Sequence, residues 1–241
     1  MRMASIAAWQ ERGLATVRSH AAQRVAAVLL TAACVLAPAV PASAAGRHSR
    51  ERKVEGSLTV TLTPPSEGLP ITNKIRILLP PGFRDAGAAL PSCSPATLEL
   101  KGPAACAKGS IVGNGTALGY TILGAQFVEE HLTLTLVNGP GGSLLTWVAG
   151  ETPVSIEVVV TGVIAKPPGY GQELSFTLPH GLLEPLPGAP GWLQTMTATL
   201  SGKSGWLRST SCPEHPWALG GELGFTNGQA VGFRATVKCL Q

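Results

Sequence analysis

Hydrophobic and polar residues alternate with a period of two over most of the chain from Gly56 onward. Such alternation is typical of β-strands that bury one face and expose the other. Glycine, proline and asparagine cluster between the alternating runs, as they do in turns. The pattern predicts about ten short strands in one all-β domain over residues 56–241, an antiparallel, immunoglobulin-like β-sandwich. The clearest alternating runs are residues 58–63, 74–77, 132–136, 154–161, 173–178, 196–200 and 233–239.

Residues 1–45 are expected to be an export signal. Four arginines precede an apolar stretch over residues 25–40, and Ala42-Ser43-Ala44 then forms a small-residue cleavage site. The apolar stretch is too short to span a membrane, and no longer one follows. Lipid attachment at Cys34 is the alternative, although the residues before it lack the usual leucine. The sequence therefore predicts an extracellular or cell-envelope location.

The basic character of the chain comes mainly from this leader. It holds four of the 18 basic and one of the 14 acidic residues, which leaves 14 and 13 in the remainder. A nearly neutral mature chain gives no basis for binding nucleic acid. Residues 46–55 (GRHSRERKVE) are expected to form a flexible basic tail before the first strand.

The mature chain contains four cysteines, which allow three pairings. Proximity favours Cys93–Cys106 and Cys212–Cys239, and an even number of cysteines in an exported domain favours structural disulfides. Between the first two, Ser94 before Pro95 predicts a helix start, because the serine hydroxyl can accept a free backbone N–H. We expect a single helical turn, ended by Gly102-Pro103.

The segment 113–119 (GNGTALG) is rich in glycine. Its glycines have the spacing GxGxxxG, which differs from the dinucleotide fingerprint GxGxxG, and no helix pattern follows. We interpret these glycines as permitting a β-bulge or a close approach between strands.

Several of these segments together resemble a class of uncharacterised secreted actinobacterial proteins. Those proteins carry a segment of the type LPxG…C…C..S.IG and a C-terminal Cys-Pro segment. Here the matching segments are LPPGF (79–83), Cys93, Cys106, KGSIVGNGTA (108–117) and STSCP (209–213), and Ala107 departs from the usual proline. The resemblance covers roughly residue 56 to the C-terminus and implies an exported domain, without implying an activity.

Glu129 and His131 form the best candidate for a reactive pair. On a strand the two share a face, so they could bind a metal or act as an acid–base pair. No third ligand has suitable spacing, and Asp85 is the only aspartate after the leader. We therefore interpret Glu129 and His131 as the polar end of a strand and predict neither catalytic residues nor a cofactor nor a metal.

Trp192, Trp206 and Trp217 lie close together in the last third of the chain and are candidate ligand-binding residues. Exposed tryptophans can stack on sugars or anchor a protein. Large aromatic side chains are more often mostly buried, which favours packing in the core.

These observations predict an exported structural or interaction module without catalytic activity, whose partner would be an envelope protein or a carbohydrate. The second interpretation is a binding module that holds a carbohydrate or another envelope ligand through the three tryptophans. An extracellular hydrolase is the third.

Overall fold

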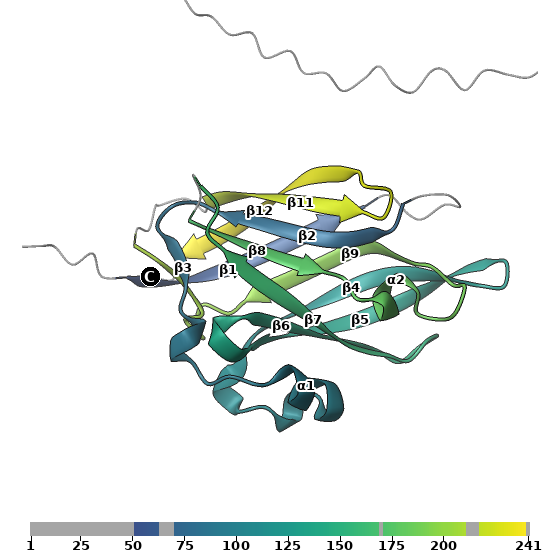
Figure 1. The fold of residues 1–241 in the computed structure, drawn as a ribbon, viewed down its shortest axis with the longest axis horizontal. Helices are drawn as coiled ribbons and strands as arrows, with labels where there is room; N and C mark the ends of the chain where they lie inside the picture. Colours follow the sequence, from purple (N-terminus) through teal and green to yellow (C-terminus); the bar gives the residue numbers. More distant parts are fainter. Residues whose placement is uncertain (1–50, 63–69, 169–170, 211–216, 240–241) are drawn as a thin grey trace, which may run out of the picture. The chain divides into compact units, whose positions relative to one another are not determined.

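A computed structural model describes residues 51–62, 70–168, 171–210 and 217–239 of the chain (Figure 1). The described residues form an all-β structure with two short helices, α1 (Pro95–Lys101) and α2 (His180–Leu183), and four 3-10 turns. The strands are β1 (Arg52–Thr61), β2 (Thr72–Leu79), β3 (Phe83–Asp85), β4 (Ile111–Leu123), β5 (Gln126–Asn138), β6 (Leu144–Gly150), β7 (Ile156–Ala165), β8 (Gln172–Thr177), β9 (Gly191–Leu200), β10 (Leu207–Ser209), β11 (Trp217–Phe225) and β12 (Ala230–Cys239). The predicted leader, residues 1–45, lies outside the described residues.

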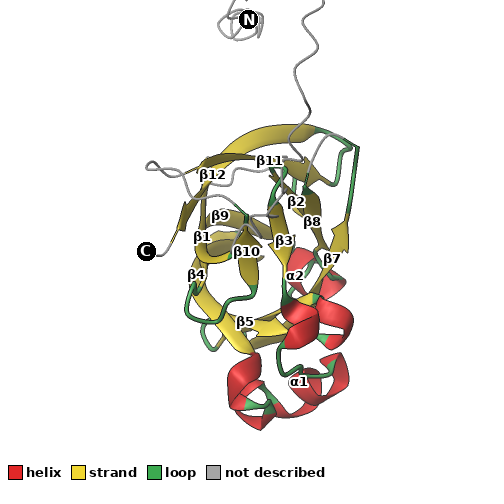
Figure 2. Ribbon diagram, turned by 90° about the vertical axis from the view of Figure 1, so that its left-hand side faces the viewer, coloured by secondary structure: helices red, strands yellow, loops and turns green. Residues whose placement is uncertain are grey.

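The described strands form one antiparallel sheet that closes on itself (Figure 2). Its order is β12-β11-β2-β8-β7-β6-β5-β4-β9-β1, and β1 pairs back with β12 through the register Val54↔Cys239 to Ser57↔Thr236. Ten of the twelve strands therefore surround a common interior. The remaining two, β10 and β3, extend from one end of β1.

This closure differs from the predicted immunoglobulin-like sandwich. A sandwich would separate the strands into two sheets, whereas here β1 pairs with β9 along Gly56–Thr61 and with β12 along Val54–Ser57. The alternating pattern is the same in both architectures, because each buries one face of every strand. All-β structure is therefore confirmed, and the arrangement into two sheets is not.

β1 begins at Arg52, inside the segment that we expected to be a flexible tail. Lys53 is exposed and Val54 is completely buried, so the alternation starts earlier than the clear run at Leu58. Pairing with β10 and β12 holds this first part of the strand in the sheet.

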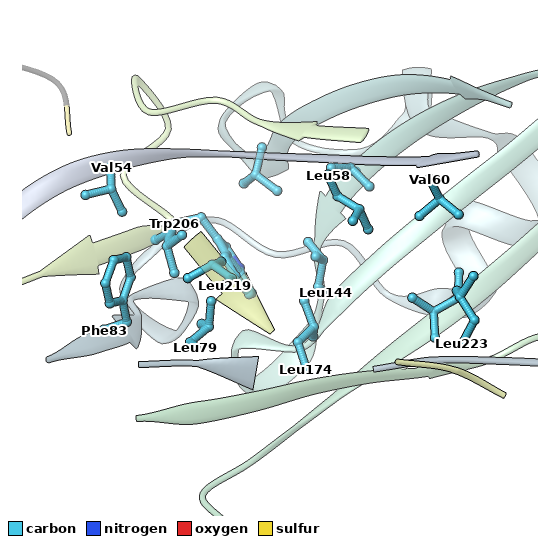
Figure 3. Close-up of a cluster of buried hydrophobic side chains, with 14 residues drawn as sticks. Val54, Leu58, Val60, Leu79, Phe83, Leu144, Leu174, Trp206, Leu219 and Leu223 are labelled. Atoms are coloured by element: carbon cyan, nitrogen blue, oxygen red, sulfur yellow. The ribbon is translucent and has the colours of Figure 1, made fainter. Parts of the chain in front are cut away.

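A cluster of buried side chains lines the interior, from Phe83 of β3 and Leu207 of β10 to Val60 of β1 and Leu223 of β11. Val54 and Leu58 of β1 face Leu79 of β2 and Leu174 of β8 across the interior of the closed sheet (Figure 3). Trp206, which directly precedes β10, is 2% exposed and belongs to the same cluster.

The loop from Cys93 to Cys106 packs on the outside of the sheet. Cys93 and Cys106 form the predicted disulfide, and the side chains of Cys93 and Leu98 pack with Val137, Leu145 and Trp147. The Ser94 hydroxyl accepts a 3.1 Å hydrogen bond from the Thr97 backbone N–H, which confirms the predicted helix start. The helix runs to Lys101, further than the single turn expected, and ends at Gly102, whose φ of 67° favours glycine.

The second predicted disulfide cannot be placed on this structure. Cys212 lies outside the described residues, and Cys239 is the last residue of β12. Cys212–Cys239 stays a prediction. Within the described part of the chain, no helix is long and apolar enough to cross a membrane.

Candidate ligand-binding cavity

A cavity of about 180 Å³ lies inside the closed sheet. Its walls are almost entirely apolar and come from nearly every strand of the ring. At one end it is bordered by Trp206 and Leu207, and at the other by Leu182 and Pro185, which belong to α2 and the segment after it. The cavity therefore extends between the β3 end and the α2 end, which lie on opposite sides in Figure 1. Among the side chains that form its walls are Ile75, Leu132, Leu134, Val148, Val160, Leu174, Phe176, Met196 and Ala198.

Two features explain why the interior is hollow. A closed sheet widens as strands are added, and about eight strands already leave room for side chains or one small ligand. In addition, β4 presents its smallest residues inward, because its register places them beside the inward Leu136, Leu134, Leu132 and Glu130 of β5. These inward residues are Gly113, Gly115, Ala117 and Gly119, and Thr121 follows in the same phase, opposite Val128. None of them projects far enough to fill the space.

The close approach of β4 to its neighbouring strands explains why segment 113–119 is rich in glycine. A Cβ atom at Gly113 would fall 2.2 Å from the backbone oxygen of Thr199, and one at Gly115 would fall 2.2 Å from that of Thr197. The register with β5 also shifts between Ile111 and Gly113. The interpretation of these glycines as sites of close strand approach is therefore confirmed.

One ionisable side chain interrupts the apolar wall near the α2 end. Glu130 is 3% exposed, and its Oε2 atom accepts a 3.1 Å hydrogen bond from the backbone N–H of Val154 in the β6–β7 connection. Its Oε1 atom is buried and has no hydrogen-bond partner in the described structure. Burial raises the pKa of the Glu130 carboxyl, while the bond from Val154 and nearby His131 act in the opposite direction.

Thr121 lies close to Glu130 on the neighbouring strand. It is 1% exposed, and its hydroxyl oxygen likewise has no partner among the described residues. Both residues line the cavity. In the described part of the chain, Thr121 Oγ1 and Glu130 Oε1 are the only fully buried side-chain oxygen or nitrogen atoms without a hydrogen bond.

Glu129 and His131, the pair selected from the sequence, face away from the cavity. Their side chains are 55% and 78% exposed, and His131 Nε2 lies 3.6 Å from Glu129 Oε2. Glu129 also accepts a 2.9 Å hydrogen bond from the Tyr120 hydroxyl. Among the residues that the structure describes, no group of three His, Cys, Asp or Glu side chains could hold a metal ion.

The three candidate tryptophans do not form one exposed surface. Trp192 is 8% exposed, borders the cavity and packs edge-on against Phe127, with ring centroids 5.5 Å apart. Trp206 is buried at the opposite end of the cavity. Trp217 is half-buried and packs against Phe83, with ring centroids 4.5 Å apart. Trp192 and Trp206 would therefore meet a ligand only from within the closed sheet.

Sequence reasoning missed Glu130, although a signal was present. Glu130 has the same phase as Leu132, Leu134 and Leu136, so the alternation that predicted the strand also predicted an inward carboxylate. Glu129 and His131 gave the stronger sequence signal, because a reactive pair usually needs two polar groups on one face.

No protein-family model matches this chain, and neither does any curated protein or solved structure. The resemblance to secreted actinobacterial proteins accordingly stays a prediction.

Proposed function

We propose that this chain is an exported, non-enzymatic binding module that holds a small apolar molecule inside its closed sheet. The observation that carries the proposal is the cavity of about 180 Å³ with its apolar walls. A dry, apolar cavity of about 150 Å³ in another protein is large enough to bind benzene. The space here suits a ligand slightly larger than benzene.

Export is part of the proposal. It rests on the leader at residues 1–45 and on the Cys93–Cys106 disulfide, which is compatible with an oxidising compartment. A second disulfide, Cys212–Cys239, would complete the covalent framework. The cell envelope or the extracellular space would then supply the ligand.

The cavity favours an apolar ligand over a carbohydrate. A sugar carries many hydroxyl groups, each of which needs a hydrogen-bond partner when it leaves water. The walls offer few polar side chains, and Trp192 and Trp206 are too buried to stack on a sugar from outside. A structural or interaction module without a ligand remains the second candidate, favoured by exposed apolar side chains such as Phe127 and Val231.

Titration with propylbenzene, followed through the methyl NMR signals of leucine, isoleucine and valine, tests the proposal. We expect saturable shifts confined to cavity residues such as Leu134 and Val160. Ala117→Leu should abolish them, because Ala117 faces the cavity from β4 and the larger side chain would occupy it. Ala165→Leu is the matched control, since Ala165 is exposed at the end of β7.

Two results would contradict the proposal. The first is the absence of saturable binding in a folded wild-type protein. The second is binding that Ala117→Leu leaves unchanged, which would place propylbenzene elsewhere on the protein.

A further inference from the structure

We propose that the cavity is a narrow channel that selects a linear hydrocarbon chain over a ring-shaped molecule with the same number of carbon atoms. This inference rests on the proposed function, because it concerns the ligand of the same cavity. It goes beyond that function by naming the shape and the chemical class of the ligand, a single alkyl or acyl chain.

The length of the cavity follows from the strand residues that border it. β9 borders the cavity from its first residue, Gly191, to its last, Leu200, and β2 borders it from Thr72 to Leu79. At about 3.3 Å per residue, the bordering part of β9 is about 30 Å long. The strands of a closed sheet are tilted by about 40° from its axis, so the cavity extends about 20 Å along that axis.

The volume of the cavity is small for this length. A sphere of the same volume, 180 Å³, would be about 7 Å across. Even with the reach of a side chain added on each side, such a sphere could not border both ends of β9. The space is therefore drawn out into a channel between Leu207 at the β3 end and Leu182 at the α2 end.

Short side chains on three neighbouring strands lie along this channel. Gly56 of β1, Ala198 of β9 and Ala117 of β4 all border the cavity. The register pairs Ala198 with Leu58 on one side and with Gly115 on the other, so Gly56 and Ala117 are its diagonal neighbours. Diagonal neighbours of this kind are about 7–8 Å apart. The three small residues thus follow one another obliquely across the sheet and leave room for a chain beside them.

A linear hydrocarbon chain matches a channel of this kind. A chain can extend along the channel, and each methylene group that leaves water strengthens binding about fourfold. A ring with the same number of carbon atoms is wider and shorter. It would push the walls apart, which a closely packed interior resists, and would leave the rest of the channel empty.

Four alcohols test the inference on the wild-type protein: 1-hexanol, 1-octanol, 1-decanol and cyclooctanol. Each carries one hydroxyl group, so the contribution of that group is common to all four. Their dissociation constants are measured by methyl NMR titration. We expect affinity to rise about fourfold for each methylene group added between 1-hexanol and 1-decanol. After correction for partition between water and hexadecane, 1-octanol should bind about tenfold more tightly than cyclooctanol.

Gly56→Leu tests the β3 end of the channel. Gly56 has the same phase as the inward Val54 and Leu58, and a Cβ atom there would lie 3.4 Å from the Leu207 side chain, an ordinary contact. The new side chain should shorten the channel and weaken 1-decanol about tenfold, whereas 1-hexanol should change by less than about twofold. Gly232→Leu is the matched control, because Gly232 is exposed on β12, and it should alter neither affinity.

Decylphosphocholine distinguishes the two sources of such a chain, a free molecule and the tail of a lipid. Its charged head group cannot enter an apolar cavity and must stay outside. Binding as tight as that of 1-decanol would identify lipid tails as the ligand, and absence of binding would identify free chains. Both results support a linear chain.

The outcomes that overturn the inference are distinguishable from failure of the proposed function. A plateau in affinity beyond 1-hexanol, or tighter corrected binding of cyclooctanol, would show a compact cavity that still binds an apolar ligand. Equal weakening of 1-hexanol and 1-decanol by Gly56→Leu would confine both to one compact site and would also overturn the inference. Failure of the four alcohols and of propylbenzene to bind the folded wild type would overturn the proposed function, and the inference with it. The wild-type series decides the question even where Gly56→Leu does not fold.

Discussion

The indole Nε1–H of Trp206 donates a 3.0 Å hydrogen bond to the side-chain oxygen of Asn138, and both residues are buried. The amide nitrogen of Asn138 in turn donates to the backbone oxygens of Gly87 and Pro91, at 2.9 and 3.0 Å. Asn138 therefore links β5, the segment before β10 and the chain between β3 and α1. These bonds connect the three segments at the end of the closed sheet opposite α2.

Asn138→Ala should lower the free energy of unfolding by about 3 kcal/mol, because it leaves the buried Trp206 N–H without its partner and removes the hydrogen bonds to the backbone oxygens of Gly87 and Pro91. Chemical denaturation monitored by tryptophan fluorescence measures the change. Asn114→Ala is the control, since Asn114 is exposed on β4, and should change stability by less than about 0.5 kcal/mol. Equal effects of the two substitutions would show that Asn138 does not hold this end together.

Glu130→Gln should stabilise the protein at neutral pH. Because burial raises the pKa of Glu130 above its unfolded value, the folded state binds this proton more tightly than the unfolded state. Wild-type stability should thus fall as pH rises from about 4.5 through the folded pKa of Glu130. The advantage of the glutamine variant should be absent near pH 3.5 and largest near pH 7. Thermal unfolding of both proteins across this range measures it.

Glu173→Gln is expected to have the opposite effect. Arg76 donates two hydrogen bonds to Glu173, of 3.0 and 2.9 Å, and lowers the pKa of its carboxyl. The resulting stabilisation is present at neutral pH and is lost as pH falls through the lowered pKa. Because Arg76 is one-third exposed, the loss at pH 7 should be about 1 kcal/mol or less. A pH profile with the same sign as that of Glu130→Gln would contradict this assignment of the two carboxylates.

Replacing Cys93 and Cys106 together by serine should lower the free energy of unfolding by about 3 kcal/mol in the chain-entropy model, since the disulfide closes a loop with a sequence separation of 13. Cys93 is also buried against Leu98 and Trp147, so the loop should loosen from the outer face of the sheet. Hydrogen exchange of residues 95–101 should report this loosening. Unchanged protection in the double variant would show that packing alone holds the loop.

Mass spectrometry of the exported protein should find an N-terminus near Ala44 or Ala45 and, without reduction, a peptide joining Cys212 to Cys239. The first result follows from the Ala42-Ser43-Ala44 cleavage site, and the second from the pairing already made by Cys93 and Cys106. An acylated N-terminus at Cys34 would make the protein a lipoprotein. Free thiols at Cys212 and Cys239 would leave the domain with one disulfide.

The sequence by itself determined the features that depend on near neighbours. Period-two alternation is a local property of a half-buried strand, so it located runs such as Leu132–Leu136 and Ile156–Val160, which are parts of β5 and β7. The Ser94 cap and the Cys93–Cys106 disulfide also join residues close in sequence. The same phase also marks Glu130 as an inward residue.

Only the tertiary structure decided how the strands are joined. Alternation says which face of a strand is buried, but a sandwich and a closed sheet bury the same face. The contact that distinguishes them pairs Val54 with Cys239, at opposite ends of the domain, and no local pattern specifies it. That closure surrounds the small inward residues of β4 with strands on every side. That Thr121 and Glu130 border a cavity is a consequence of the closure, because it depends on the register of two strands and on the ring that encloses them.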